Sequence, residues 1–441
     1  MEKTKILAVT CARSDAGLMA PVWREIQASP TLDLEICATG MHLLERFGRT
    51  VDAVREMGFD VAYEASSLME DDPDGGGTAA RAMGRGILTL TEIYEHAQPD
   101  LLLVLGDRFD MFPAAAAALP LGIPVAHVSG GELSFGAIDE SLRHAITKLS
   151  HIHFPCTDDG ARRIIAMGEE PWRVRAVGAP GLDAIRGFEP WPVEKLTRRF
   201  GFSARGTNVL VTYHPVTLTP ESTEIRLREF LSALERLDAR ILFTWPNADP
   251  GSEIIVRGIE EFVAKHPERA RVVVNAGHEG YLSLLCRSDL VVGNSSSGLT
   301  EAGAFETPVV DVGGRQEGRL HPANVLWADD DAEEILSACR RALSAAFRES
   351  LRGFRNPYGD GQAGRRIREV LEVLPPRRRL LHKRFASQEM GPDDFRKSMD
   401  SKSHRSPAGV GILAPETARF STSAESPQDL ETPTDLVLDD E

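Results

Sequence analysis

The sequence predicts an α/β protein built from two doubly wound parallel sheets that face a shared cleft. Ten short apolar runs recur along the chain and are separated by polar or amphipathic segments of helix length. The runs form two series, divided by the stretch GAPGLDAIRGFEPWPVEKL, which mixes Gly, Pro and Trp. The length of 441 residues is too great for one compact core, so two domains are expected.

Each apolar run has the character of a strand that is buried on both faces of a parallel sheet. The first series comprises residues 5–10, 34–40, 101–107, 123–128 and 151–156, and the second comprises residues 208–214, 240–245, 271–277, 289–295 and 307–313. The helix-length segments between them indicate βα repeats with right-handed crossovers.

The organisation that follows is an N-terminal domain over residues 1–185 and a C-terminal domain over residues 186–375. From residue 376 the composition changes to the basic run PPRRRLLHKRF and then to Ser, Pro, Asp and Glu. Weak apolar periodicity predicts that residues 376–441 form a disordered tail. A regulatory or partner-binding tail is the alternative.

The composition excludes several classes of protein. The formal net charge is −16, whereas proteins that bind nucleic acids or membrane surfaces are usually basic. No apolar run reaches the roughly eighteen residues that span a bilayer, and the N-terminus lacks the apolar region of a signal peptide. Five scattered cysteines without a CxxC pair indicate a reduced, cytoplasmic protein without structural zinc.

Acidic side chains follow two neighbouring strands of the first series. Asp107 ends one strand in VLGDRFDMF, and Glu132 follows the Gly-Gly turn after the next strand. Asp139 starts the helix DESLRHAITKLS. In a doubly wound sheet, ligands bind at the carboxyl ends of the strands. Carboxylates gathered there can have their pKa values pushed apart, so that one acts as acid and another as base.

Structural roles are the alternative for these acidic residues. Asp107 could cap the following helix with Arg108 as its partner. Asp139 could be an N-cap that forms a surface ion pair with Arg143, worth well under ~1 kcal/mol. Carboxylates at two successive strand ends favour the catalytic interpretation.

The second series carries the signs of a nucleotide site. His214 ends one strand before a proline, and Asn247 follows another in FTWPNADPGS. VVGNSSSGLTEAG leads a strand into Ser295 and Ser296 and then a helix with Glu301 in its first turns. Small hydroxyl residues and free N–H groups at a helix start suit a diphosphate. A Ser-capped helix is the alternative, and no Walker loop is present.

The histidines do not form a predicted metal site. His42 follows a strand and a glycine, and His151 and His153 share one face of a strand. A zinc site would need a clustered third ligand, which the sequence does not supply. Hydrogen-bonding roles are therefore expected, and no metal is predicted.

Taken in order, these motifs resemble the hydrolysing UDP-N-acetylglucosamine 2-epimerases, which start sialic-acid synthesis. The resemblance covers about residues 5–370 and includes ILAVTCARSD, TGMHL, GDRFD, AIDESLRHAITKLSHIHFPCT, HPVT, PNADPGS, GNSSSGLTEAGAFETPVVDVGGRQEGR and NPYGDG. It implies a GT-B-like fold with two Rossmann-like domains. It also implies elimination of UDP from UDP-GlcNAc to give a glycal, hydration to N-acetylmannosamine, no cofactor, and a homo-oligomer (dimer or tetramer).

The resemblance assigns roles to individual residues of this chain. Asp107 and Asp139 match catalytic acidic residues, and Glu132 is expected to share the role. The matched nucleotide contacts are Arg13, Arg108, His214, Asn247, Ser295, Ser296, Glu301 and Arg315.

Two departures from relatives concern the sugar side of the site. Ser129 stands where several relatives have a catalytic Glu, and Ala16 stands where relatives often have an aromatic residue. Some relatives act on a UDP- or GDP-linked diacetamido sugar on the route to legionaminic acid, which leaves the sugar open. A GT-B glycosyltransferase and a non-catalytic nucleotide-sugar sensor are the further alternatives.

Overall fold

The computed structural model describes residues 3–73, 75–135, 137–216, 222–246, 251–274 and 276–386. Contacts divide the chain into residues 1–395 and residues 396–441, and the second unit lies outside the described ranges. The architecture below therefore belongs to the first unit.

The N-terminal lobe is built on a six-stranded parallel sheet. Its strands are β1 (Thr4–Thr10), β2 (Leu32–Thr39), β3 (Val61–Ala65), β4 (Leu101–Leu105), β5 (Val125–Val128) and β6 (Ile152–Phe154). They lie in the order β3-β2-β1-β4-β5-β6. This is the Rossmann order, in which the chain reverses its direction of winding between the first and fourth strands.

The C-terminal lobe repeats this arrangement. Its strands are β7 (Asn208–Thr212), β8 (Arg240–Thr244), β9 (Ala270–Val273), β10 (Leu290–Gly293), β11 (Val309–Val312) and β12 (Val325–Ala328). The order β12-β11-β10-β7-β8-β9 is the same Rossmann order, read in the opposite direction. The predicted fold class, two Rossmann-like doubly wound sheets in a GT-B-like arrangement, is confirmed.

Two strands escaped the sequence prediction, and both lie at sheet edges. Residues of β3 alternate between half-buried and exposed, and three of the four residues of β12 are also only half-buried or exposed. An edge strand has a neighbour on one side only, so it does not need the continuous apolar run of a central strand. The ten central and flanking strands that were predicted are all present.

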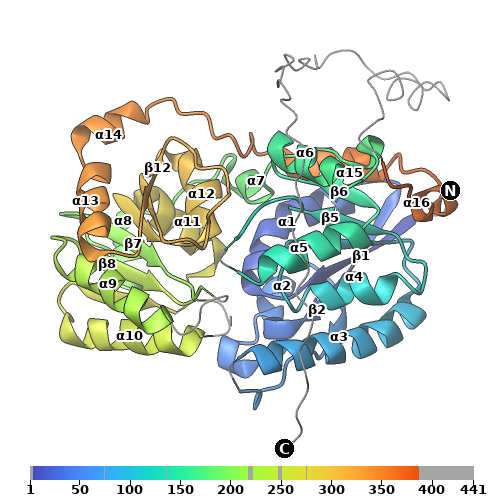
Figure 1. Ribbon diagram of the computed structural model, residues 1–441, viewed down its shortest axis with the longest axis horizontal. Coiled ribbons are helices and arrows are strands. Elements are labelled where there is room, and N and C mark those ends of the chain that lie inside the picture. The colour runs from blue at the N-terminus through green and yellow to red at the C-terminus, as the bar shows by residue number, and fades with distance from the viewer. Residues whose placement is uncertain are drawn as a thin grey trace, which may run out of the picture. The chain divides into compact units, whose positions relative to one another are not determined.

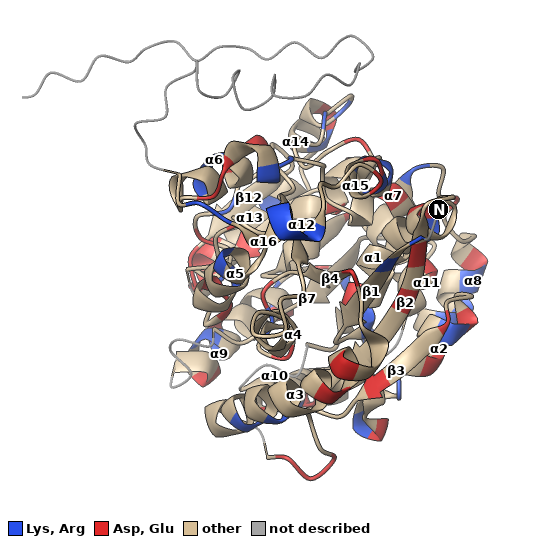
Figure 2. Ribbon diagram, turned by 90° about the vertical axis from the view of Figure 1, so that its right-hand side faces the viewer, with Lys and Arg blue, Asp and Glu red and all other residues tan. Residues whose placement is uncertain are grey.

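Helices cover both faces of each sheet (Figure 1). Those of the first lobe are α1 (Arg13–Gln27), α2 (Val51–Glu56), α3 (Gly76–Ala97), α4 (Phe112–Ala118), α5 (Asp139–Leu149), α6 (Asp158–Ala166) and α7 (Gly181–Ile185). Those of the second are α8 (Val193–Phe200), α9 (Thr223–Glu235), α10 (Ser252–Lys265), α11 (Gly277–Arg287), α12 (Ser296–Thr300), α13 (Ala332–Ala342) and α14 (Ala345–Ser350). Figure 2 shows acidic and basic residues mixed over the helices rather than separated by sign.

Each sheet separates two apolar cores, because successive strand side chains point to opposite faces. In β1, Ile6 and Ala8 join the core under α1, whereas Leu7 and Val9 join the core under α3 and α4. The second sheet does the same with α9, α10 and α13 on one face and α8 and α11 on the other. This packing holds the carboxyl ends of the strands in fixed positions.

The last described helices return to the N-terminal lobe. Helix α15 (Ala363–Leu371) packs on α1, with Ile367 fully buried in the core beneath β1 (Figure 1). A Cβ atom on Gly364 would lie 3.1 Å from Val22 Cα, so the glycine allows the two helices to approach closely. The Asp183 carboxylate accepts hydrogen bonds from the first backbone N–H groups of α15, at 2.8 Å from Ala363 N. The predicted division at residues 185 and 375 stays a prediction.

Residues 376–386 were assigned to the tail by the sequence but are described here. They include α16 (Arg377–Leu381), in which Leu380 is 4% exposed. Arg173 donates hydrogen bonds to the carbonyls of Leu380 (2.9 Å) and His382 (3.1 Å), and Lys383 forms an ion pair with buried Glu169 (2.8 Å). The sequence missed this contact because the partners lie about two hundred residues apart. The rest of the predicted tail lies outside the described residues.

Candidate active site

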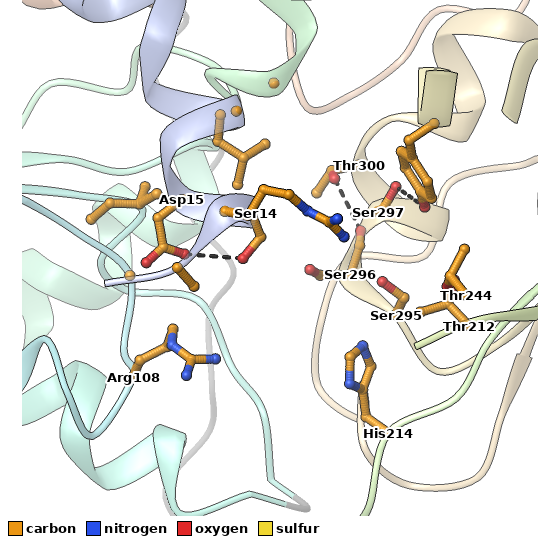
Figure 3. A pocket seen from close by; sticks show the side chains of 18 of the residues that line it. Ser14, Asp15, Arg108, Thr212, His214, Thr244, Ser295, Ser296, Ser297 and Thr300 are labelled. Carbon is orange, nitrogen blue, oxygen red and sulfur yellow. Dashed lines mark hydrogen bonds between the residues drawn. The ribbon is translucent and has the colours of Figure 1, made fainter. Parts of the chain in front are cut away.

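A cavity of about 510 Å³ lies between the carboxyl ends of the two sheets. Its walls include the segments after β1 and β4 in one lobe and after β7 and β10 in the other. These are the points where each sheet reverses its winding, and where ligands bind in doubly wound folds. Figure 3 shows Ser14, Asp15 and Arg108 on one side of the cavity, with His214, Ser295, Ser296 and Ser297 opposite.

The predicted site residues come together in this cavity. Its lining includes Arg13, Asp107, Arg108, Glu132, Asp139, His214, Ser295, Ser296, Glu301 and Arg315. Asn247, the remaining predicted residue, lies outside the described residues. The roles assigned to these residues from the sequence stay predictions.

Asp107 is fixed by a buried arginine. Its carboxylate forms an ion pair with Arg143 of α5, whose side chain is only 2% exposed. Helix α4 has Met111 at its N-cap, so Asp107 is not the helix cap that the alternative interpretation required. Arg108 bonds instead to Asp110, with 3.0 Å between Arg108 Nε and Asp110 Oδ1. Asp107 is therefore oriented toward the cavity by tertiary contacts.

Glu132 is the most buried of the three predicted catalytic carboxylates, with 8% of the residue exposed. Burial raises the pKa of Glu132, and the nearby Arg319 guanidinium acts against that shift. Arg319 Nε lies 3.9 Å from Glu132 Oε2. Within the described part of the chain, the buried Glu132 Oε1 atom has no hydrogen-bond partner. Burial therefore favours the protonated form of this carboxyl, as suits a group that holds a proton for transfer.

Asp139 is the first residue of α5, as predicted, and it lies half-exposed in the cavity wall. The N-cap position is occupied by Ile138, so Asp139 is not itself the cap residue. Arg143, its predicted partner, forms ion pairs with Asp107 and Glu140. Arg143 thus links α5 to the carboxylate of Asp107 inside the lobe.

The C-terminal lobe presents hydroxyl groups and a histidine. The His214 backbone is held by Asn294, whose side chain accepts from His214 N (2.7 Å) and donates to His214 O (2.9 Å). Tyr281 donates to Ser297 Oγ at 2.8 Å. Arg315 donates to the Asn294 carbonyl at 3.2 Å. These bonds fix a surface of donors at the end of β10, suited to a diphosphate.

Glu301 closes the same wall near the lobe boundary. It is 5% exposed, and burial raises its pKa, which a hydrogen bond with Ser297 partly offsets. A Cβ atom on Gly181 would lie 2.6 Å from Glu301 Oε1. The absence of a side chain at Gly181 therefore makes room for this carboxylate.

Sequence reasoning missed several cavity residues, including Arg143, Arg319 and Asp15. Arg143 and Arg319 were not recognised as site residues, because their carboxylate partners are remote in sequence or lie in the other lobe. Asp15, at the start of α1, is also buried in the wall, and burial raises its pKa to about 6. The signal for Asp15 was its place after a strand end in ARSD.

The histidines outside the cavity have structural partners. His42 lies between Thr10 and Thr50, each at 2.9 Å. His151 accepts from Val125 N at 3.1 Å, and His153 pairs with Glu169 at 3.0 Å. Among the described residues, no group of three or more His, Cys, Asp or Glu side chains could hold a metal ion.

The two departures from relatives have different consequences. Ser129 lines the cavity with a left-handed φ of 62°, and its hydroxyl lies 3.2 Å from Cys156 Sγ. Ala16 is buried in the core beneath β1 and is not among the residues that line the cavity. Only the change at Ser129 therefore alters the cavity wall directly.

Comparison with known proteins identifies relatives of this chain. Residues 24–372 match the family described as UDP-N-acetylglucosamine 2-epimerase. A UDP-N,N'-diacetylbacillosamine 2-epimerase (hydrolyzing) from Legionella pneumophila is 37% identical over 387 residues, covering 86% of this chain and 98% of the relative. A GDP/UDP-N,N'-diacetylbacillosamine 2-epimerase (hydrolyzing) from Campylobacter jejuni is 32% identical and covers 79% of this chain and 90% of the relative.

A solved structure supports the fold. The UDP-GlcNAc 2-epimerase from Neisseria meningitidis, bound to UDP-GlcNAc, superposes with a TM-score of 0.71 at 21% identity, covering 83% of this chain and 99% of that structure. The family match extends over most of the chain, and relatives above 30% identity are covered almost completely. The chain is therefore an enzyme of the UDP-N-acetylglucosamine 2-epimerase family, as its motifs predicted.

Proposed function

We propose that the chain is a hydrolysing nucleotide-sugar 2-epimerase that converts a UDP-linked 2-acetamido sugar and water into UDP and the free 2-epimer. The observation that carries the proposal is the composition of the cavity. Carboxylates of the N-terminal lobe face hydroxyl and N–H donors of the C-terminal lobe across one space.

The reaction needs both sides of this cavity. A base removes the proton from C2 of the sugar, the C1–O bond breaks, and its electron pair leaves with UDP. Water then supplies a hydroxyl to C1 and a proton returns to C2 on the opposite face. Asp107, Glu132 and Asp139 are proposed to move the protons, a role suited to carboxyls of differing burial. No redox cofactor takes part in this sequence.

The other wall is proposed to hold UDP. His214, Ser295, Ser296, Glu301, Arg315 and, from the N-terminal lobe, Arg13 and Arg108 line it. Fixed donors at the diphosphate stabilise the charge that develops as the bond breaks. Burial lowers the pKa of Arg13, and a bound diphosphate would favour its charged form. Asn247 remains a proposed contact.

The favoured sugar is a 2,4-diacetamido-trideoxy sugar of the bacillosamine type. The relatives from Legionella pneumophila and Campylobacter jejuni, at 37% and 32% identity, carry that substrate in their names. Ser129 lines the cavity together with Cys156 and Glu132, and it is smaller than the Glu that several relatives carry there. The space gained supports the larger diacetamido sugar. UDP-N-acetylglucosamine is the second candidate, supported by the family description and by a relative from Neisseria meningitidis at 29% identity.

A panel assay of UDP release tests the proposal. UDP-diacetylbacillosamine, its GDP counterpart and UDP-GlcNAc are incubated with the enzyme, and products are identified by mass spectrometry and NMR. The expected result is UDP and a free 2-epimer, with the diacetamido sugar giving the highest kcat/KM. An intact epimerised nucleotide sugar would contradict hydrolysis. Transfer only to an added acceptor would indicate a glycosyltransferase, and binding without turnover would indicate a sensor.

Cellular placement and assembly are also proposals. All five cysteines are free thiols, which supports a reducing compartment such as the cytoplasm. Within the described residues, no helix has the length and apolar character needed to cross a bilayer. A homo-oligomer is proposed from the family resemblance, and light scattering at several concentrations measures it.

A further inference from the structure

Arg319 reaches from the C-terminal lobe to the loop that carries Glu132. It follows β11, and its side chain is only 11% exposed. Its Nε donates to the Leu133 carbonyl at 2.9 Å, and its Nη2 donates to Ser134 Oγ at 3.2 Å. The same guanidinium lies 3.9 Å from the Glu132 carboxylate. Three consecutive residues of one lobe thus contact a single side chain of the other.

Shape complementarity accompanies these polar contacts. Gly318 has a φ of +84°, and a Cβ atom there would lie 2.7 Å from the Phe135 ring and 3.0 Å from Leu133 Cβ. The carbonyl of Leu320 accepts a hydrogen bond from the Tyr358 hydroxyl at 2.9 Å. The Arg319 segment, residues 318–320, is therefore packed against the Glu132 loop at Gly318 and bonded to Tyr358 at Leu320.

The contact continues to a second carboxylate. Ser134 Oγ, which accepts from Arg319, also accepts from Arg143 Nη2 at 3.1 Å. Arg143 forms the ion pair with Asp107 and donates to the Glu132 carbonyl at 2.9 Å. Two arginines, one from each lobe, thus share one serine and between them hold Glu132 and Asp107.

We propose that Arg319 is a positioning residue that fixes the Glu132 carboxylate from the opposite lobe, so that Glu132 takes its reactive place only when the lobes are together. The inference rests on the proposed 2-epimerase reaction and names a residue on which that reaction depends. Glu132 lies on a loop after a Gly-Gly turn, and its Oε1 atom is left without a hydrogen-bond partner among the described residues. Its orientation therefore depends on its neighbours, and the Arg319 guanidinium approaches it from the other lobe to 3.9 Å.

Several charged or ionisable groups face Glu132. From its own lobe these are Arg163 and Asp159 of α6 and Cys156 after β6. The others are Arg319, which follows β11 of the C-terminal lobe, and the Tyr358 hydroxyl, which lies between α14 and α15. Burial raises the pKa of Glu132, and the Arg319 cation lowers it. Removing that cation should therefore raise the pKa of Glu132 further. Whichever limb of the pH–rate profile Glu132 controls should then move to higher pH.

The test compares Arg319→Gln and Arg319→Lys with wild type and with Glu317→Gln. Glu317 is exposed in the same segment and does not line the cavity, so its variant is a matched control. We expect Arg319→Gln to lower kcat roughly 100-fold while KM changes little, because displacing a reacting group by about 1 Å costs that much. Arg319→Lys keeps the positive charge but cannot make both hydrogen bonds, to Leu133 and to Ser134. This variant should therefore regain part of the lost kcat and keep the wild-type pH profile.

A second measurement does not depend on turnover. Hydrogen exchange of residues 131–135 is followed with saturating UDP as the probe, and it should be faster in Arg319→Gln than in wild type or Glu317→Gln. Equal exchange rates in the variants and the wild type would overturn the positioning role. A raised KM with unchanged kcat would also overturn it and would make Arg319 a substrate contact. A wild-type enzyme inactive on every sugar would contradict the proposed function, while the exchange data would still decide whether Arg319 holds the loop.

Discussion

The carboxylate of Asp107 owes its position to Arg143, a guanidinium that is itself almost completely buried. A buried arginine without its partner is costly, so the pair resists rearrangement. Burial lowers the pKa of Arg143, and the carboxylates around it favour its charged form. The ion pair thus fixes the direction of the Asp107 side chain.

Replacing Asp107 by Asn should abolish most turnover while UDP binding remains. We expect kcat to fall by roughly 10²–10⁴-fold, the usual contribution of a positioned acid or base. UDP should still raise the thermal unfolding temperature, because the nucleotide wall is unchanged. Asp52→Asn, on the exposed surface of α2, is the control and should keep full activity. Unchanged turnover in Asp107→Asn would remove Asp107 from the mechanism.

Sequence reasoning found the site residues that follow strands and missed those that support them. Asp107 and Ser295 stand where apolar runs end, so their place in a doubly wound sheet follows from pattern alone. Helical spacing predicts Arg143 as the partner of Asp139, one turn away, but the structure places its contacts with Asp107 and the Glu132 loop. Arg319 escaped because its partners belong to the other lobe, and local spacing carries no information about them.

Helix α15 shows how a late element can complete an early core. Ile367 and Leu371 are buried with Trp23 and other side chains beneath the first sheet. The glycine at 364 and the Asp183 carboxylate fix where α15 begins and how closely it lies on α1. The N-terminal sheet is therefore incompletely covered until the end of the chain has folded onto it.

Truncating Ile367 to Ala should destabilise the protein. The side chain is fully buried, and comparable Ile→Ala changes in cores cost about 2–5 kcal/mol through lost burial and the cavity left behind. Urea unfolding followed by tryptophan fluorescence measures the change. Val373→Ala, at a site 77% exposed, should be nearly neutral. Equal midpoints for the two variants would show that α15 contributes little to the core.

The sequence predicted elements best where burial is continuous. Central strands such as β4 and β10 are apolar throughout, which made their positions readable. The edge strands β3 and β12 carry polar or half-exposed residues and resemble loops in composition. The attachment of α15 and α16 to the first lobe was not predictable, because apolar periodicity reveals a buried face but not the surface that buries it.

Several histidines in the N-terminal lobe are buried in the neutral form. Burial lowers the pKa of His42 to about 4, of His127 to about 3 and of His151 to about 4. The His127 ring also bonds to the Gly106 carbonyl at 2.7 Å. These folded-state pKa values lie below the value of 6.5 for an accessible histidine, so the unfolded chain binds protons first.

Acid should therefore destabilise the protein through these three histidines, while Asp15, whose pKa is raised to about 6, opposes part of the loss. The stability from these histidines is fully present above pH 6.5 and is lost as pH falls toward 4. Near pH 5 the three together should lower the free energy of unfolding by roughly 4 kcal/mol per pH unit. Urea midpoints at pH 7, 6 and 5 measure the slope, and His42→Gln should reduce it by about a third. A flat profile over this range would contradict the expectation.

The return of α15 to the first lobe has a mechanical consequence. The polypeptide passes between the lobes twice, near residues 186–192 and again near residues 351–362. One connection would leave the lobes free to rotate relative to each other in several directions. Two separate connections restrict that rotation. Any relative movement of the lobes must bend both connections at once, so we expect it to follow the line that joins the two crossings.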